Sequence, residues 1–220
     1  MQWHMPRRAF VIGMLGLIGC TRRNTSEAKG LAKPLVRDDL YQCEGCEGAL
    51  EVDPASLHSD AQIATAQEPG DRMQITGTVF AADGTTPAPD VVIYAYQTNA
   101  QGLYAGGTPE TEASRRHGRL RAWVRTGDDG MYRFDTIKPA PYPDDTIPAH
   151  IHFTVLERAK RPYWIDDIVF AGEFGVTNAY RQSMTNKGGD GIVKLTRAEG
   201  GLWLAKRDIV LEQHPRLKVN

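Results

Sequence analysis

Short segments in which apolar and polar residues alternate recur along this chain, and turn-forming clusters rich in Gly, Asp and Asn separate them. Alternation with a period of two places successive side chains on opposite faces of a strand. Strands are therefore predicted at 73–80, 91–97, 120–125, 131–134, 150–157, 164–170, 192–195 and 202–211. Many short strands separated by turns favour an all-β fold, an antiparallel β-sandwich with little helix. The 22 Gly and 13 Pro residues agree with such a turn-rich chain.

Length and charge narrow the possibilities further. A chain of 220 residues can bury the core of one domain, and no internal repeat divides it. The net charge of −1 provides no field for a polyanion, so nucleic acid is not expected as a partner. One short helix is expected within 54–65, where Asp53 could cap its first turn.

The first twenty residues have the organisation of an export signal. Arg7 and Arg8 precede an apolar run of 11 residues, which is too short to span a bilayer but has the length of a signal-peptide core. The alternative, a buried first strand, is disfavoured because no polar residue alternates within the run. The run ends in Leu-Ile-Gly-Cys20, which resembles the lipobox of bacterial lipoproteins, and this resemblance implies that Cys20 is lipidated.

The predicted organisation is a signal peptide at 1–19, a lipidated tether at 20–42 and one domain at 43–220. The tether is polar and lacks periodicity. Such a protein would sit in the bacterial cell envelope, facing the periplasm or the exterior, and would touch the membrane only through its lipid. The Arg pair also resembles a twin-arginine signal, although Pro6 replaces the usual Ser or Thr and no Lys follows. The sequence does not choose between the two export routes, and it leaves the oligomeric state open.

Two further cysteines, Cys43 and Cys46, form a CxxC pair. Zinc would need two more ligands of similar spacing, and haem attachment would need His where Glu47 stands. A thioredoxin-like site would need a strand before the pair and a helix after it. For an exported protein a local disulfide is the favoured interpretation.

The densest group of chemically active residues surrounds His150 and His152. Residues two apart in a strand share a face, so both imidazoles would project together as possible metal ligands. The pair alone does not select a metal, and a polar strand face with two surface histidines would look the same.

Four segments, taken in order, resemble the intradiol ring-cleavage dioxygenases, most closely the protocatechuate and hydroxyquinol branch. They are Gly77-Thr-Val-Phe-Ala-Ala-Asp-Gly, the segment 92–104 ending in Asn-Ala-Gln-Gly-Leu-Tyr104, the segment 126–143 ending in Lys-Pro-Ala-Pro-Tyr142-Pro, and Pro148-Ala-His-Ile-His-Phe153. The resemblance covers roughly 73–175.

This resemblance implies a β-sandwich that holds one non-haem Fe(III) ion through Tyr104, Tyr142, His150 and His152. Phenolate oxygens are suited to a hard ferric ion. The substrates implied are a catechol-type aromatic diol and O2. Both oxygen atoms would enter the ring, which would open between its two hydroxyl-bearing carbons to a muconate-type diacid. Tyr142 would be the catalytic ligand that leaves the metal and accepts a catechol proton.

The chain also departs from the family pattern. Ile147 stands where members commonly have Arg, and Asp166 or Asp167 stands where they have a polar group such as Gln. Because this cation is missing, the sequence determines neither the substrate nor whether turnover is retained. An arginine elsewhere could supply the charge, the candidates being Arg115, Arg116, Arg119, Arg121 and Arg161.

Two other hypotheses remain. One is a non-catalytic prealbumin-like binding module of the cell envelope, which would need neither the His pair nor the placed tyrosines. The other is a copper or zinc protein that uses the same histidines.

Overall fold

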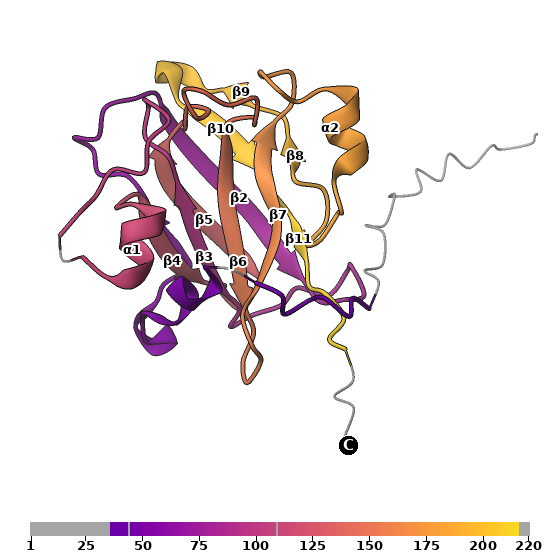
Figure 1. Cartoon of the computed structure of the whole chain (residues 1–220). Helices are drawn as coiled ribbons and strands as arrows, with labels where there is room; N and C mark the ends of the chain where they lie inside the picture. The colour runs from indigo at the N-terminus through magenta and orange to yellow at the C-terminus, as the bar shows by residue number, and fades with distance from the viewer. Residues whose placement is uncertain (1–35, 44, 109, 216–220) are drawn as a thin grey trace, which may run out of the picture.

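Two β-sheets pack face to face in the computed structural model, which describes residues 36–43, 45–108 and 110–215 (Figure 1). The first sheet has the order β1 (Asp60–Gln62), β5 (Met131–Ile137), β2 (Arg72–Phe80), β10 (Trp203–Lys206) and β9 (Thr196–Arg197), with β11 (Ile209–Val210) also pairing with β2. The second has the order β4 (Arg121–Arg125), β3 (Val92–Gln97), β6 (His150–Leu156), β7 (Tyr163–Phe170) and β8 (Ile192–Val193). The predicted all-β sandwich is confirmed.

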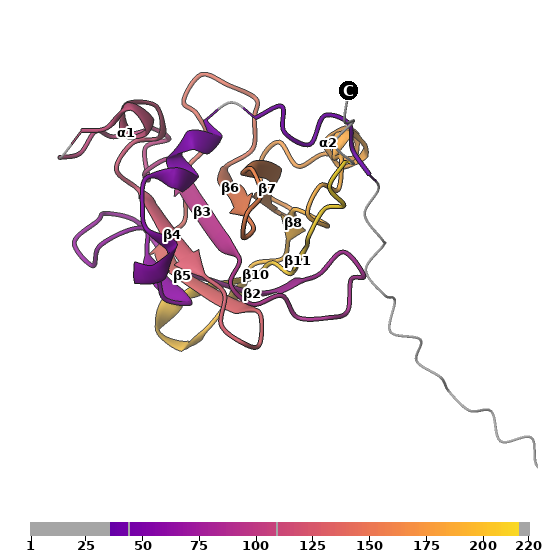
Figure 2. The same cartoon turned by 90° about the horizontal axis from the view of Figure 1, so that it is seen from below.

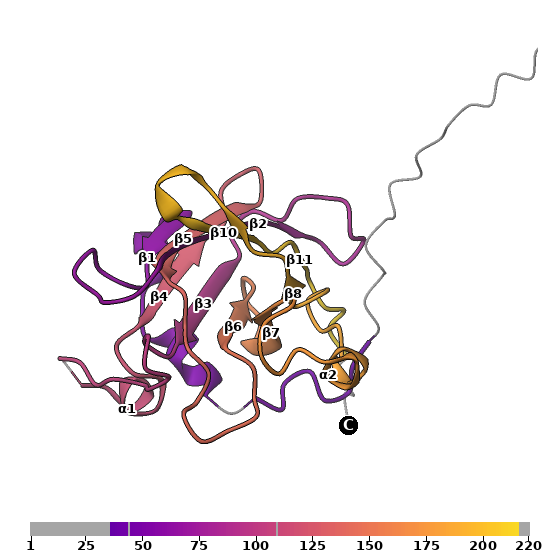
Figure 3. The same ribbon diagram turned by 90° about the horizontal axis from the view of Figure 1, so that it is seen from above.

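The core lies between the sheets and follows from the alternation in the sequence. In β2, every second residue is buried, and Ile75 is fully buried. From the second sheet Phe153 meets Phe134 of the first, with ring centroids 5.7 Å apart. Views from below and from above show the two layers edge-on (Figures 2 and 3). Burial of this shared apolar face is the main stabilising contribution to the fold.

Both sheets are mixed rather than purely antiparallel. The pairs β2–β5, β3–β4, β3–β6 and β6–β7 are antiparallel, whereas β1–β5, β2–β10, β2–β11 and β7–β8 are parallel. The strands that add these parallel pairs, β1, β8, β10 and β11, lie toward the ends of the domain in sequence. Long-range parallel pairing leaves no hairpin signal in the sequence, so the prediction of an antiparallel sandwich was incomplete.

The prediction of a helix within 54–65 was wrong in extent. Asp53 does cap a turn, because its Oδ1 accepts from the Ala55 amide at 2.9 Å, but only the 3-10 helix η2 (Pro54–Ser56) follows. The chain then enters β1, since pairing with β5 satisfies its backbone groups. Two short helices, α1 (Glu112–His117) and α2 (Asn178–Ser183), lie in the long connections and were not predicted.

The domain begins before residue 43, although 20–42 was expected to be a tether. Leu40 is fully buried, and Val36 pairs with Gln213 near the other end of the domain. The Tyr41 hydroxyl lies 2.6 Å from His214 Nδ1. Packing therefore extends to residues 36–42. The signal peptide, Cys20 and the rest of the expected tether lie outside the described residues.

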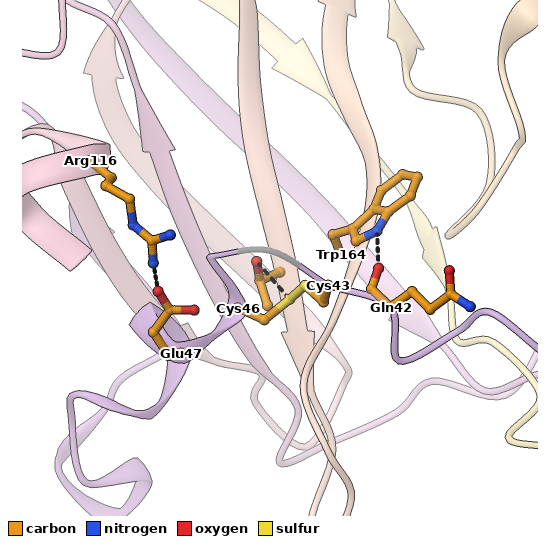
Figure 4. The surroundings of a disulfide bond; sticks show 7 residues. Gln42, Cys43, Cys46, Glu47, Arg116 and Trp164 are labelled. Atoms are coloured by element: carbon orange, nitrogen blue, oxygen red, sulfur yellow. Dashed lines mark hydrogen bonds and ion pairs between the residues drawn. A yellow bond between two sulfur atoms is a disulfide. The ribbon is translucent and has the colours of Figure 1, made fainter. Parts of the chain in front are cut away.

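A disulfide joins Cys43 and Cys46, with Cα atoms 5.7 Å apart, where the chain crosses the second sheet (Figure 4). Just before it, the Gln42 carbonyl accepts a hydrogen bond from the Trp164 indole at 3.1 Å. Just after it, the 3-10 helix η1 (Cys46–Leu50) contacts β3, β6 and α1, and Glu47 pairs with Arg116. This segment covers the outer face of the second sheet, the face turned away from the first. Within the described part of the chain no helix is long and apolar enough to cross a bilayer.

Candidate metal centre

Strand β6 directs both histidines of the HxH pair to the outer face of the second sheet. Ile151 and Phe153, which alternate with them, point into the core and are almost fully buried. His150 is 7% exposed, whereas His152 is partly open to solvent. The period of two therefore places the two imidazoles together, as predicted from their spacing.

The two tyrosines approach the histidines from separate loops. Tyr104 lies in the connection after β3, where the Asn99 side chain accepts from the Gln101 and Leu103 amides at 2.9 and 3.0 Å. Tyr142 lies in the loop between β5 and β6. The loops touch at Gly102, whose φ of 77° favours glycine and where a Cβ atom would collide with the Pro141 carbonyl. This close contact brings the tyrosines side by side.

The four predicted ligand side chains converge so that their polar atoms form a closed ring of contacts. Tyr104 Oη lies 2.8 Å from Tyr142 Oη and 2.9 Å from His152 Nε2. His150 Nε2 lies 3.0 Å from His152 Nε2 and 3.3 Å from Tyr142 Oη. Residues from one strand and two loops thus present two phenol oxygens and two imidazole nitrogens to one point.

The hydrogen-bond partner of Nδ1 in each imidazole shows which ring nitrogen carries the hydrogen. His150 Nδ1 lies 2.7 Å from the Pro148 carbonyl, which only accepts, so Nδ1 carries the hydrogen. His152 Nδ1 lies 2.9 Å from Asp167 Oδ1 and donates to that carboxylate in the same way. In the neutral tautomer that these partners select, each ring offers an unprotonated Nε2 to the cluster.

A count of protons shows that the cluster fits a cation. With both Nε2 atoms unprotonated, only the two phenol hydrogens are available for four contacts of 2.8–3.3 Å. At least two of the contacts therefore bring lone pairs face to face, which costs free energy when they are buried. A metal ion held by all four atoms would turn this repulsion into coordination.

Burial favours the uncharged forms of Tyr104, Tyr142 and His150. Burial raises the pKa of Tyr104 far above its ordinary value, and the neighbouring Tyr142 adds to the effect. Burial likewise raises the pKa of Tyr142 and lowers that of His150, the latter with a contribution from His152. A multivalent cation would reverse the preference of the tyrosines, because it stabilises a phenolate directly.

Asp167 in β7 joins the site behind His152. The group His150, His152 and Asp167 could by itself hold a metal, since one ligand atom of each lies within 4.8 Å of the others. However, Asp167 binds Nδ1 of His152, and the two ring nitrogens point in diverging directions. For a metal on both Nε2 atoms, Asp167 would orient the ligand rather than coordinate. The sequence pointed to Asp166 or Asp167 without deciding; Asp166 instead binds Thr185 and the Asn186 amide.

An aromatic stack supports His152 from the other side and was not predicted. The ring of Tyr96 lies 4.4 Å from that of His152 and 3.9 Å from that of His117, at interplanar angles of 22° and 10°. His117 is held in turn by the Tyr94 hydroxyl, 2.8 Å from its Nδ1. The spacing of Tyr94 and Tyr96, two residues apart in β3, could have indicated that their rings share one face of the sheet. Nothing in the sequence indicated where α1 would place His117.

The arginines considered as substitutes for the family's missing cation are occupied elsewhere. Four of them pair with acidic side chains, Arg115 with Glu110, Arg116 with Glu47, Arg119 with Glu68, and Arg121 with Glu51. Arg161 lies over the ring of Tyr41. Ile147 is 43% exposed on the loop before β6.

A cavity of about 350 Å³ lies on the outer face of the sheet beside His152, on the side where Asp167 and Tyr96 contact that ring. It shares His152 and Asp167 with the site, and its other lining residues are Gln42, Tyr96, Phe153, Thr154 and Trp164. The cavity lies directly beneath the disulfide-linked segment, since Gln42 is part of its wall.

Comparison with known proteins finds a family of dioxygenases. A family model described as dioxygenase matches residues 51–188. Catechol 1,2-dioxygenase 2 of Acinetobacter lwoffii is 28% identical over 169 residues, which cover 64% of this chain and 60% of that protein. The protocatechuate 3,4-dioxygenase beta chain of Burkholderia cepacia is 31% identical over 145 residues, 60% of each protein. The chain spans only about half of most of the curated relatives that it matches, for example 47% of the chlorocatechol 1,2-dioxygenase of Rhodococcus opacus.

Solved structures agree with the fold. The dioxygenase domain of a dioxygenase and carbohydrate-binding protein fusion from Streptomyces sp. SirexAA-E aligns with a TM-score of 0.53 at 21% identity, covering 70% of this chain and 89% of that one. The hydroxyquinol 1,2-dioxygenase of Pseudomonas putida DLL-E4 aligns with a TM-score of 0.51 at 22% identity, covering 71% and 61%. At such identities the likeness concerns the fold.

Proposed function

The chain belongs to the intradiol ring-cleavage dioxygenase family, and from that premise we propose that it is an Fe(III)-dependent enzyme that opens a catechol-type ring with O2. One catechol and one O2 would combine, both oxygen atoms entering the product. The carbon–carbon bond between the two hydroxyl-bearing carbons would break to give a muconate-type diacid. The observation that carries the proposal is the convergence of Tyr104, Tyr142, His150 and His152 on one point.

These four side chains would hold the iron. Bound there, a ferric ion would withdraw electron density from a coordinated diol and make its ring reactive toward O2. Two phenol oxygens are a suitable donor set for a hard trivalent cation, and they favour its oxidised state. Copper and zinc prefer imidazole or thiolate, so the paired tyrosines weigh against the alternative of a site built on the histidines alone.

The protein's own contribution to the chemistry would be to orient ligands and to move protons. Pro148 and Asp167 accept hydrogen bonds from the Nδ1 atoms of His150 and His152 and so direct the Nε2 atoms inward as the metal donors. Tyr142 comes from a loop, and its hydroxyl contacts both Tyr104 and His150. It is the residue that we propose to release the metal and accept a proton from the diol.

Iron loading tests this proposal. Purified protein reconstituted with iron is expected to bind one Fe(III) per chain and to show the broad visible colour of ferric tyrosinate. Tyr142→Phe should change that spectrum and abolish oxygen uptake with catechols. Tyr41→Phe is the matched control, because its hydroxyl contacts His214 instead of the cluster. A colourless protein that retains no iron would contradict the proposal and favour a non-catalytic β-sandwich module.

A further inference from the structure

We propose that Tyr96 and His117 are positioning residues for His152, and that the Cys43–Cys46 disulfide holds them in place. Reduction of the disulfide by a dithiol would then loosen the metal centre, so that the cysteine pair acts as a redox switch. The inference rests on the proposed function, because it concerns the same metal centre. It is supported by a continuous series of contacts that leads from the disulfide to the imidazole of His152.

The series starts at the metal centre, with an aromatic stack on one face of His152. Asp167 holds the edge of this imidazole by a hydrogen bond at Nδ1, but a single hydrogen bond does not fix the plane of the ring. The ring of Tyr96 lies 4.4 Å from that of His152 and 3.9 Å from that of His117, close to parallel with both. Stacking on a broad aromatic face supplies the missing restraint.

The backbone that follows the disulfide holds His117 in turn. The His117 ring is 4% exposed, and a Cβ atom on Gly45 would lie only 2.7 Å from its Nε2. A Cβ atom on Gly48 would lie 2.6 Å from the ring of Tyr94, whose hydroxyl lies 2.8 Å from His117 Nδ1. The segment is therefore in close contact with both rings, and any shift of its backbone changes the room that His117 occupies.

The disulfide joins this segment to a separate contact on β7. Just before the bond, the Gln42 carbonyl accepts from the Trp164 indole (Figure 4). At the bond itself, Cys46 is buried and its Sγ lies 3.9 Å from Thr154 Oγ1 of β6. Two stretches of chain that rest on different strands are thus tied together covalently. Without the bond, each stretch could leave the sheet independently of the other.

The bond is accessible to thiol–disulfide exchange from one side. Cys43 is partly exposed, whereas Cys46 is 5% exposed. A thiolate of an incoming dithiol would attack the Cys43 sulfur and release Cys46 as a thiolate, which takes up a proton. The second thiol of the reagent would then form the reagent's own disulfide and release Cys43 as a thiol. Two electrons and two protons pass from the dithiol to the protein, and the covalent link is lost.

The size of the effect follows from the role of groups that orient a metal-bound histidine. Removal of such a group typically changes metal affinity by about 10- to 100-fold. Asp167 remains in place when the disulfide opens, so only one of the two restraints on His152 is lost. A loss of about tenfold, the lower end of this range, is therefore expected.

Reduction of the metal-free full-length protein tests the structural part of the inference. Trp123 donates from its indole to the Gly48 carbonyl at 2.9 Å, and Trp164 donates to the carbonyl just before the disulfide. Dithiothreitol should shift both indole N–H signals in an NMR spectrum and speed their hydrogen exchange. The indole signal of Trp203, which lies in β10 of the first sheet, should not change and is the control. Unchanged signals after complete reduction would overturn the inference.

Serine variants test the effect on the metal centre, because a dithiol would itself reduce or bind ferric iron. The double variant Cys43→Ser, Cys46→Ser should bind Fe(III) about tenfold more weakly than the wild type in competition with a chelator. Its visible band should also shift. Val79→Ala is the matched control, because it removes buried volume from β2 of the other sheet. It should lower the melting temperature without changing the band or the affinity.

Variants of Tyr96 test the route from the disulfide to the metal. Tyr96→Phe keeps a stacked ring and should retain most of the affinity, whereas Tyr96→Leu should lose about as much as the double serine variant. Tyr96→Leu added to that variant should cause little further loss, because both changes remove the same restraint. Losses that add in full would show that the disulfide does not act through Tyr96.

Failure of the inference and failure of the proposed function give different results. If the wild type is coloured and the double serine variant has the same affinity and spectrum, the inference is wrong and the proposed function stands. A wild-type protein that retains no iron would instead contradict the proposed function.

Discussion

The two histidines of the cluster are neighbours in one strand, yet they are held by different kinds of acceptor. His150 donates to a neutral carbonyl, that of Pro148, whereas His152 donates to the carboxylate of Asp167. A carboxylate behind an imidazole raises its basicity and so strengthens its bond to a metal. His152 should therefore be the stronger donor of the two.

Asp167→Asn should expose this difference, because it keeps the shape of the side chain and removes its charge. Iron affinity is expected to fall by about 10- to 100-fold, and the visible band should shift because the ferric ion loses electron density. Competition with a chelator and absorption spectroscopy would measure the two effects. Asp144→Asn, which removes one exposed charge from the loop, is the matched control. Unchanged affinity and spectrum in Asp167→Asn would refute this role.

Among the elements, α1 is short but determines what lies behind His152. Thr111 and Ser114 form a reciprocal capping box at its start, with the Ser114 amide donating to Thr111 Oγ1 at 3.1 Å. The last residue, His117, is 4% exposed and stacks on Tyr96. Burial lowers the pKa of His117 to about 4, and Arg116 adds to the effect. The helix is thus docked through a neutral histidine.

A histidine whose pKa is depressed in the fold makes stability depend on pH. Between about pH 6.5, its ordinary pKa, and about pH 4, the unfolded chain binds a proton that the folded chain does not. The free energy of unfolding should therefore fall as the pH drops through this window. Denaturant titrations of metal-free protein at pH 7, 5.5 and 4.5 would measure it.

The contribution of His117 is isolated by substitution. Between pH 7 and pH 4.5, the free energy of unfolding of His117→Gln should fall less than that of the wild type. His58→Gln, at an exposed site, should lose as much as the wild type. Equal pH dependence in all three proteins would show that His117 does not dock α1 in the neutral form.

At the scale of the whole molecule, each sheet has a face outside the core, and the N-terminal segment covers part of the outer face of the second sheet. Residues 36–42 pack on the domain, the disulfide follows, and η1 contacts β3, β6 and α1. Gln42 thereby becomes a wall of the cavity. A disulfide beside the site is expected in an oxidising compartment. It therefore supports the proposal, which the first twenty residues motivate, that the protein is exported; the proposed lipid anchor rests on the sequence around Cys20.

Substitution of the predicted lipidation site tests the anchor. Cys20→Ala, expressed in a bacterial host with lipoprotein processing, is expected to move the protein from the membrane fraction to the soluble fraction. Mass spectrometry should show the loss of the lipid. The double variant Cys43→Ser, Cys46→Ser should remain in the membrane fraction. If Cys20→Ala stays membrane-bound with an unchanged mass, the anchor proposal is wrong.

Local sequence patterns predicted much of this fold. The period of two placed most strands within a few residues, since alternation reflects which side chain of each strand meets the core. The same period brought His150 and His152 to one face. Motif resemblance added Tyr104 and Tyr142, which no local rule connects to them.

Tertiary structure decided what depends on contacts between distant segments. The parallel pairs of β1, β8, β10 and β11 join residues far apart, and β1 replaced an expected helix because β5 offered it hydrogen bonds. Asp167 reaches His152 only through the register of β6 and β7, which shifts between Ile151 and Phe153. Residue types and their spacing therefore determined the candidate ligands. The proton positions and the aromatic stack that supports His152 were decided by the way the strands and loops pack together.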